Sequence, residues 1–182
     1  ARGETFFAPA GRTGSTPLAG ADVDVTVTTT ASTGPPAVHV RQAERADLLA
    51  VYRIETEAFG QPWPFSAFEQ YLGKPGFLVA TGDSVAGYVV ADVVSDRGVP
   101  VGHIKDLAVH ENKRGEGIGG LLLARALGVL GSEGVQATKL EVRESNDRAI
   151  ELYRSYGFEY RTTVPGYYED GEDALLLVRR RR

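Results

Sequence analysis

The chain has 182 residues, of which 42% are hydrophobic and 9% aromatic, enough for one ordinary domain with a buried core. Its net charge of -4 disfavours a protein that wraps nucleic acid or binds anionic membranes, and we expect neither partner. The sequence contains no cysteine, which excludes disulfide scaffolds, thiolate metal sites and cysteine nucleophiles. The three histidines are widely spaced, so we expect no metal site.

Residues 1–36 differ in composition from the rest of the chain, being rich in small and polar side chains. Such a segment buries too little apolar surface to offset its chain entropy. We therefore expect a flexible or disordered extension over 1–36 and one folded domain over 37–182. The arginines at 179–182 are interpreted as a solvated end. The first residues lack the basic-then-apolar order of a secretion signal, so a cytoplasmic protein is the default expectation.

From residue 37 the hydrophobic periodicity becomes regular. It predicts a short strand at 38–40, a helix over 44–59, a second helix over 66–72, and strands over 76–81 and 85–94. Ser66 and Glu69 have the spacing of a capping box at the start of the second helix. The residues Gly82, Asp83 and Ser84 have hairpin-turn composition and separate the two strands.

The second half of the chain alternates strands and helices. The pattern predicts a strand over 101–109, a helix from near Gly117 to 131 or 134, a strand over 137–143, a helix over 146–156, and strands over 158–163 and 174–179. The resulting order is close to βααββββαβαββ. Early hairpins followed by β-α-β crossings favour an α/β fold with a mixed sheet and helices on both faces.

The junction His110–Gly120 lies between a strand and an apolar helix and is rich in glycine. Glycines let the backbone approach a ligand closely, and the first amides of a helix are donors at the positive end of its dipole. This combination favours a phosphate-bearing ligand. Lys113 and Arg114 add positive charge for the same anion.

A dinucleotide-binding loop is an alternative for this junction. Gly115, Gly117 and Gly120 satisfy G-x-G-x-x-G, and Glu141 follows 21 residues later, where a ribose-binding acid would stand. In dinucleotide folds, however, the first glycine directly follows the strand, whereas five polar residues intervene here. The 62 residues after Gly120 also end in two strands with no helix between them. Both differences count against dinucleotide binding.

The segment Arg114–Gly119 resembles the R/Q-x-x-G-x-G/A pyrophosphate loop of the GNAT acetyltransferase superfamily. Residues 62–65, 106–109, 140–146, 149–153, 156–158 and 167–177 are similar to segments of the RimI-like N-terminal acetyltransferases within it, so the resemblance spans about 38–178. Gly115 and Glu116 depart from the basic or amide side chains that are usual in that loop. The resemblance implies a GNAT-type mixed, mostly antiparallel central sheet of six to seven strands, with about four helices on both faces.

The resemblance implies transfer of an acetyl group from acetyl-CoA, as co-substrate, to the N-terminal α-amine of a protein with a small first residue such as Ala or Ser. A ribosomal protein is one candidate substrate. Because the chain has no cysteine to carry an acyl group, we expect direct transfer in a ternary complex. The implied acetyl-CoA contacts are the strand end, the glycine loop and a helix cap: Leu107, Ala108, Val109, Arg114, Gly115, Glu116, Gly117, Ile118, Gly119, Gly120 and Asn146.

The resemblance also implies two catalytic residues. Glu141 matches the glutamate that removes a proton from the substrate amine through a water, and Tyr153 matches the tyrosine that assists departure of the thiolate. Tyr153 lies seven residues after Asn146, on the same helix face. Each has a structural alternative: an ion pair of Glu141 with a neighbouring basic residue, a core position for Tyr153, and a helix cap for Asn146.

For the peptide substrate, the resemblance implies a site between the first two helices and the last hairpin. Tyr167 and Tyr168 match paired tyrosines that hold the first peptide residue, and Phe59 with Trp63 forms the opposite wall. The structural alternatives are a surface aromatic pair and a core tryptophan. Two other functions stay open: a GNAT enzyme acting on lysine or a small amine, and a non-catalytic acyl-CoA-binding module. We expect a monomer or weak dimer.

Overall fold

The computed structural model describes residues 37–181, so the extension expected over 1–36 lies outside the described residues. The helices are α1 (Leu48–Ala58), α2 (Phe65–Tyr71), α3 (Ile118–Ser132) and α4 (Asp147–Ser155). The strands are β1 (His39–Gln42), β2 (Phe77–Thr81), β3 (Val85–Asp96), β4 (Val99–Val109), β5 (Ala137–Arg143), β6 (Glu159–Val164) and β7 (Ala174–Arg180). Within the described part of the chain, no helix is long and apolar enough to cross a membrane.

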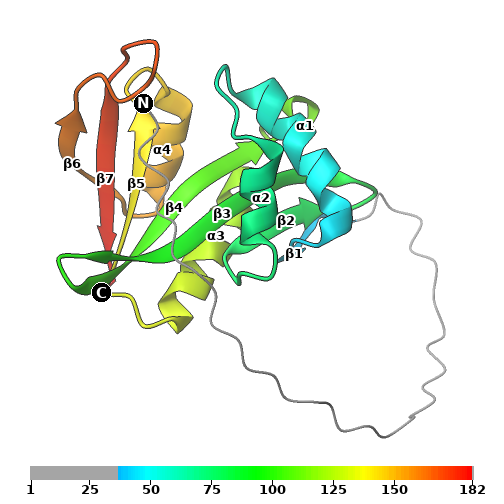
Figure 1. Cartoon of the computed structure of the whole chain (residues 1–182), viewed down its shortest axis with the longest axis horizontal. Helices are drawn as coiled ribbons and strands as arrows, with labels where there is room; N and C mark the ends of the chain where they lie inside the picture. Colours follow the sequence, from blue (N-terminus) through cyan, green and yellow to red (C-terminus); the bar gives the residue numbers. More distant parts are fainter. Residues whose placement is uncertain (1–36, 182) are drawn as a thin grey trace, which may run out of the picture.

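The strands within residues 37–181 form one seven-stranded sheet in the order β1-β2-β3-β4-β5-β7-β6 (Figure 1). Every neighbouring pair is antiparallel except β4 and β5, which are parallel. The structure thus confirms the mixed, mostly antiparallel sheet. Three consecutive strands lie between α2 and α3, as the predicted ranges have them, so the expected order contained one strand too many. β3 and β4 run on to a tight turn at Arg97 and Gly98.

The first helical region also differs in detail from the expectation. A 3-10 turn (Arg45–Asp47) precedes α1, and a capping box forms there between Glu44 and Asp47. The capping box predicted at Ser66 is wrong: α2 begins at Phe65, Pro64 occupies the cap position, and no side chain caps the helix. The φ of -67° that proline holds at Pro64 suits a helix start, so Ser66 lies inside the first turn.

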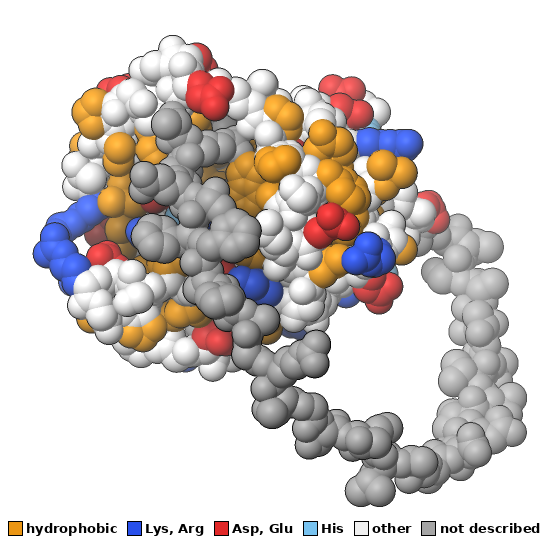
Figure 2. All heavy atoms as spheres, viewed as in Figure 1, with side chains coloured by type: hydrophobic (Ala, Val, Ile, Leu, Met, Phe, Trp, Pro, Cys, Tyr) orange, Lys and Arg blue, Asp and Glu red, His pale blue; other side chains and the backbone are white. Residues whose placement is uncertain are grey.

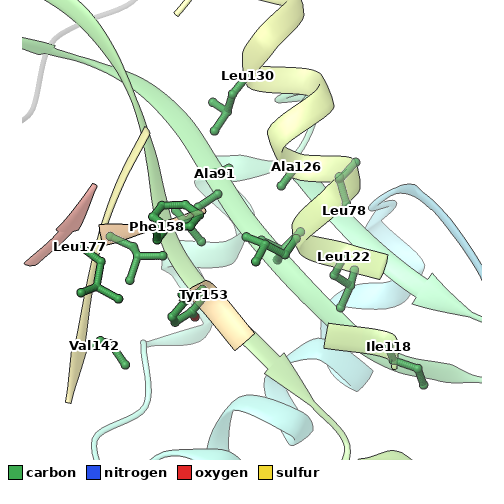
Figure 3. Close-up of a cluster of buried hydrophobic side chains, with 14 of the residues drawn as sticks. Leu78, Ala91, Ile118, Leu122, Ala126, Leu130, Val142, Tyr153, Phe158 and Leu177 are labelled. Atoms are coloured by element: carbon green, nitrogen blue, oxygen red, sulfur yellow. The ribbon is translucent and has the colours of Figure 1, made fainter. Parts of the chain in front are cut away.

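Helices cover both faces of the sheet, as predicted. The larger apolar cluster joins α3 and α4 to one face of the sheet (Figure 3). Leu140 and Val142 of β5 belong to this cluster. The opposite face carries α1 and α2, with Phe68 and Tyr88 at the centre of the second cluster. Since side chains alternate along a strand, the residues of β5 between the buried ones, including Glu141, face the α1–α2 side.

The sheet opens between its two central strands. β4 and β5 pair only at Gly102 with Thr138 and at His103 with Lys139. Beyond these pairs, β4 remains paired only with β3 and β5 only with β7, so the two halves of the sheet separate. A bulge in β4 at Lys105 accompanies the separation. The connections α1–α2 and β6–β7 lie at the end of the molecule where this gap opens (Figure 1).

Candidate active site

The glycine loop leads from the end of β4 into α3. Gly115 and Gly117 have φ values of 87° and 81°, in the left-handed region that favours glycine. The helix ladder starts with the Leu121 N–H, which donates to the Gly117 carbonyl at 3.1 Å. The amides of residues 118–120 therefore belong to the first turn, where helix amides have no acceptor within the helix. A phosphate suits this positive end of a 15-residue helix.

The next two glycines of the loop also have a packing role. A Cβ added at Gly120 would lie 2.8 Å from the hydroxyl oxygen of Tyr156, and one at Gly119 would lie 3.4 Å from Cδ2 of Leu152. Both partners belong to α4 or its C-terminal end. These glycines therefore let α3 approach α4 closely, a role that the motif did not reveal.

The basic side chains near the loop are engaged with the protein itself. Arg114 donates from Nε to the Val109 carbonyl at 3.1 Å, which ties the loop to the end of β4. Lys113 lies 3.7 Å from Glu116. A further cation comes from α4, because Arg148 Nη2 lies 3.7 Å from the position that a Cβ on Gly115 would occupy. The sequence held no local signal for Arg148, since only the docking of α4 brings it to the loop.

Glu141 lies on β5 just beyond the point where β4 and β5 separate. Its Oε2 is 2.6 Å from Nε2 of His103, the last β4 residue paired with β5. The side chains are 16% and 18% exposed, so the pair is shielded but reachable from solvent. The structure replaces the alternative partners of Glu141, Lys139 and Arg143, with His103. No sequence motif pointed to His103, which stands 38 residues away.

The charge state of Glu141 follows from this pairing. Burial acts to raise its pKa, but the hydrogen bond from His103, the charge of that imidazole and the nearby Lys139 outweigh burial and hold the pKa below its usual value. Glu141 is therefore an ionised carboxylate at neutral pH. An ionised acceptor beside an open strand gap is what removal of a proton from an amine requires.

Tyr153 is buried on α4, where its ring packs edge-on against Phe158 at 5.9 Å (Figure 3). Burial raises its pKa, with further contributions from the charges of Asp106 and Tyr168. The phenol therefore keeps its proton at neutral pH and can donate it in a hydrogen bond. Asn146 caps the same helix by accepting from the Ala149 N–H at 3.2 Å, as its structural alternative predicted.

The β6–β7 connection carries the paired tyrosines. Tyr167 and Tyr168 are half-buried and meet edge-on at 5.1 Å. Arg143 of β5 lies over the Tyr168 ring at 3.9 Å and also pairs with Asp170 and Glu172. Hydrogen bonds from Ser145 and Arg143 lower the pKa of Glu172 to about 2. The ion pairs of Asp170 and Glu172 with Arg143 therefore tie the β6–β7 connection to β5.

Phe59 and Trp63 lie in the α1–α2 connection, both half-buried against the α1–α2 cluster. The Trp63 ring stacks on Tyr71 at 5.9 Å and contacts Phe68 at 5.6 Å. On the face viewed in Figure 2, hydrophobic side chains gather over α1 and α2. One side of the Trp63 ring thus packs on the core, and the rest of the side chain stays accessible in the α1–α2 connection.

Comparison with known proteins identifies the family. The acetyltransferase (GNAT) family matches residues 48–158. An uncharacterized N-acetyltransferase of Methanocaldococcus jannaschii is 38% identical over 146 residues, covering 78% of this chain and 91% of that protein. The ribosomal protein bS18-alanine N-acetyltransferase of Escherichia coli (strain K12) is 34% identical over 144 residues, covering 76% and 95%. The crystal structure of Ard1 from Thermoplasma volcanium superposes with a TM-score of 0.73 at 29% identity, covering 79% and 97%.

The chain belongs to the acetyltransferase (GNAT) family. It is an N-acetyltransferase that uses acetyl-CoA as its acetyl donor, as the sequence predicted. Family membership decides against a dinucleotide-binding fold, and so does the sheet, whose only parallel pair is β4 with β5. Among residues 37–181 of this acetyltransferase, no group of three or more His, Asp or Glu side chains is arranged to hold a metal ion.

The C-terminal arginines of the acetyltransferase lie at the other end of β5 and β7, away from the strand gap. Arg179 donates to the Tyr156 carbonyl at 2.9 Å and Arg181 to the Gly131 carbonyl at 2.8 Å. These carbonyls stand at the C-terminal ends of α4 and α3, where a cation is favourable. These two arginines of the predicted solvated end therefore also bond to the ends of helices, and Arg181 stays exposed while it does so.

Proposed function

We propose that this acetyltransferase transfers the acetyl group to the α-amine of a protein whose first residue is small, such as Ala or Ser. The observation that carries the proposal is the Glu141–His103 pair, an ionised carboxylate held at the edge of the gap between β4 and β5. The Escherichia coli relative named for a ribosomal protein alanine supports the α-amine as acceptor and a ribosomal protein as one candidate substrate.

Acetyl-CoA fits the side of the gap formed by β4 and α3. The glycine loop would hold the pyrophosphate on backbone amides, with Arg148 beside it. Its amide-bearing pantetheine arm would extend along Leu107, Ala108 and Val109 like an added strand, because β5 has left β4 by that point. The thioester would then lie where the strands separate, between Glu141 and Tyr153.

The chemistry needs two protons to leave the nitrogen and one to reach the sulfur. Glu141 would accept the first proton from the substrate ammonium through a water, and His103 would hold the carboxylate in place. The freed nitrogen lone pair then forms a bond to the acetyl carbonyl carbon, the carbon–sulfur bond breaks, and the nitrogen releases its second proton to water, which leaves a neutral amide. Tyr153 would stabilise the departing thiolate with its hydroxyl proton, which burial keeps on the oxygen. Direct transfer of this kind balances without a covalent acetyl-enzyme.

The acceptor preference follows from amine ionisation and from the walls of the gap. An α-amine has a pKa near 8 and a lysine amine one near 10.4, so at pH 7.5 roughly two orders of magnitude more of the α-amine is deprotonated. Tyr167 and Tyr168 on one side, and the connection carrying Phe59 and Trp63 on the other, would enclose the end of a peptide.

The deciding experiment is a peptide panel that varies only the first residue, incubated with acetyl-CoA and read by mass spectrometry. We expect acetylation at the first nitrogen of peptides that begin with Ala or Ser, and slower reaction with bulky first residues. The matched control is the same peptide with a blocked amino terminus and an internal lysine. Equal reaction of that control, with acetyl on the lysine side chain, would replace the proposal with a lysine acetyltransferase.

A further inference from the structure

A buried polar cluster links α1 to the two long central strands. Glu55 and Tyr88 are 0% exposed and Asp106 is 9% exposed. The Tyr88 hydroxyl donates to Glu55 Oε2 and lies 3.2 Å from Asp106 Oδ2. Two carboxylates placed in an apolar core are costly unless hydrogen bonds compensate for lost hydration. The three side chains are therefore held together as one unit.

The second oxygen of Glu55 contacts the α1–α2 connection. Its Oε1 accepts a hydrogen bond from the backbone N–H of Trp63. Because Pro62 and Pro64 have no N–H, this group is the only backbone donor among residues 62–64. The Phe59 N–H donates to the backbone carbonyl of Glu55 at 3.0 Å. The Glu55 side chain thus anchors the connection at its tryptophan, while its backbone carbonyl accepts the last helical hydrogen bond of α1.

The other end of the cluster lies at the strand gap. Asp106 directly follows the β4 bulge residue Lys105, where β4 has already left β5. Its charge also reaches the hydroxyl of Tyr153 on the far side of the sheet. A continuous set of contacts therefore runs from Trp63 through Glu55 and Tyr88 to Asp106 at the gap.

We propose that Glu55 is a positioning residue that holds the Trp63 connection in register with β4, so that the connection forms one wall for the peptide acceptor. The inference rests on the proposed function for the identity of that acceptor. The side chain of Glu55 binds the Trp63 N–H and the Tyr88 hydroxyl, whereas the glycine loop is tied to the end of β4 by Arg114 and packs near α4. Loss of Glu55 should therefore weaken peptide binding and leave acetyl-CoA binding intact.

The test uses Glu55→Ala, Glu55→Gln and the control Val51→Ala. Val51 is 0% exposed, lies one turn earlier on α1 and is apolar, so its truncation removes packing of the helix and no hydrogen-bonding group. Trp63 is the only tryptophan of the chain, so intrinsic fluorescence reports on the connection directly. Peptide KM, acetyl-CoA Kd, tryptophan emission and Tm are measured for each variant, well below its Tm.

We expect Glu55→Ala to shift the Trp63 emission to longer wavelength, increase its quenching by acrylamide, and raise the peptide KM by about tenfold, the scale of one lost charged hydrogen bond. The acetyl-CoA Kd should change less than about twofold. Glu55→Gln should restore both readouts, since its amide oxygen accepts from the Trp63 N–H and its amide nitrogen donates to Tyr88. Val51→Ala should lower Tm without moving either readout.

Two outcomes overturn the proposal: unchanged emission and peptide KM in Glu55→Ala, or the same changes in Val51→Ala at an equal loss of Tm. The proposed function fails separately, if the wild-type protein acetylates no peptide α-amine. In that case the fluorescence comparison of the three variants still decides whether Glu55 holds the connection. Wild-type activity with an unaltered Glu55→Ala protein would keep the function and remove the positioning role.

Discussion

The two sides of the strand gap differ in composition: one consists mainly of backbone groups and the other of side chains. On the proposed acetyl-CoA side, backbone groups of one continuous segment would do the binding, from the end of β4 through Gly115 and Gly117 into α3. On the peptide side, side chains arrive from separate segments: the α1–α2 connection, β5 and the β6–β7 connection. Glu141 stands at the border, joined to His103 across the sheet.

This difference decides how each side responds to mutation. Backbone amides persist through most substitutions, so the acetyl-CoA side fails only when a side chain changes the backbone path or fills the space of the ligand. The peptide side depends on contacts such as Arg143 over Tyr168, each of which one truncation removes. Binding of acetyl-CoA and binding of peptide should therefore be separable by mutation.

The largest effect on kcat is expected for Glu141, which lies between the two sides of the strand gap. Glu141→Gln removes the proton acceptor but keeps the shape of the side chain, so kcat should fall by roughly 10²-fold or more while the acetyl-CoA Kd stays nearly constant. Calorimetry for acetyl-CoA and initial rates with an Ala-first peptide measure the two quantities. The exposed Glu144→Gln, one residue beyond β5, is the matched control and should be fully active. Undiminished turnover of Glu141→Gln at neutral pH would remove Glu141 from the mechanism.

Gly117→Val is expected to break the acetyl-CoA side alone. Its φ of 81° is unfavourable for a β-branched residue, and the side chain would stand where the pyrophosphate approaches. We expect the acetyl-CoA Kd to rise by about tenfold or more, roughly 1.4 kcal/mol per factor of ten. Gly128→Val in the middle of α3, where the added Cβ meets nothing within 4 Å, controls for a side chain elsewhere on the helix. An equal loss of affinity in both variants would count against the loop.

Tyr153→Phe should reduce kcat by about tenfold, because its hydroxyl acts only as the thiolate leaves. The ring, which packs on Phe158, is retained, so acetyl-CoA binding and Tm should be close to wild type. Tyr160→Phe, which loses a surface hydroxyl contact with Thr163, is the control. A rise in acetyl-CoA Kd with unchanged kcat would show that the hydroxyl binds the co-substrate and does not assist departure.

The conformation of the glycine loop could be predicted from the sequence because its information is local. The spacing of Gly115 and Gly117 after a strand and before an apolar helix specifies the loop, and the structure has positive φ at both. Hydrophobic periodicity likewise located every strand and helix between 37 and 181, apart from the extra strand in the expected order. Alternation along β5 correctly separates Leu140 and Val142 from Glu141.

The partners of the site residues could not be predicted, because tertiary contacts decide them. His103 reaches Glu141 across the sheet only because β4 and β5 are parallel neighbours with that register. Arg148 reaches Gly115 through the docking of α4 on α3. Glu55 occupies a position on α1 that periodicity assigns to the core, and only the fold brings Trp63 and Tyr88 to its two oxygens.

Tyr168→Ala tests the peptide side with a smaller expected effect. Loss of the ring removes the surface on which Arg143 rests, and loss of the hydroxyl would remove the proposed donor to the peptide. We expect the peptide KM to rise by about three- to tenfold, with the KM for acetyl-CoA changed less. Tyr160→Ala removes an exposed tyrosine from the neighbouring strand and should change neither. A larger rise in the KM for acetyl-CoA than in the KM for peptide would mean that Tyr168 contacts acetyl-CoA and not the peptide.

The smallest expected effect concerns the pH dependence of the free energy of unfolding. The pKa of Glu141 is lowered in the folded protein, chiefly by the bond from His103 acting against burial, so its ionised form stabilises the fold. A carboxylate of this kind contributes stability above its unfolded pKa, near 4.3, and loses it as the pH falls through the lower folded value. Denaturant unfolding of the wild-type protein and Glu141→Gln should therefore give free energies that differ at pH 7 and converge as the pH falls below about 4. Asp47, whose pKa Arg41 also lowers, titrates in both proteins and cancels in the difference. A difference that stays constant or grows on acidification would mean that the ionised Glu141 does not stabilise the strand gap.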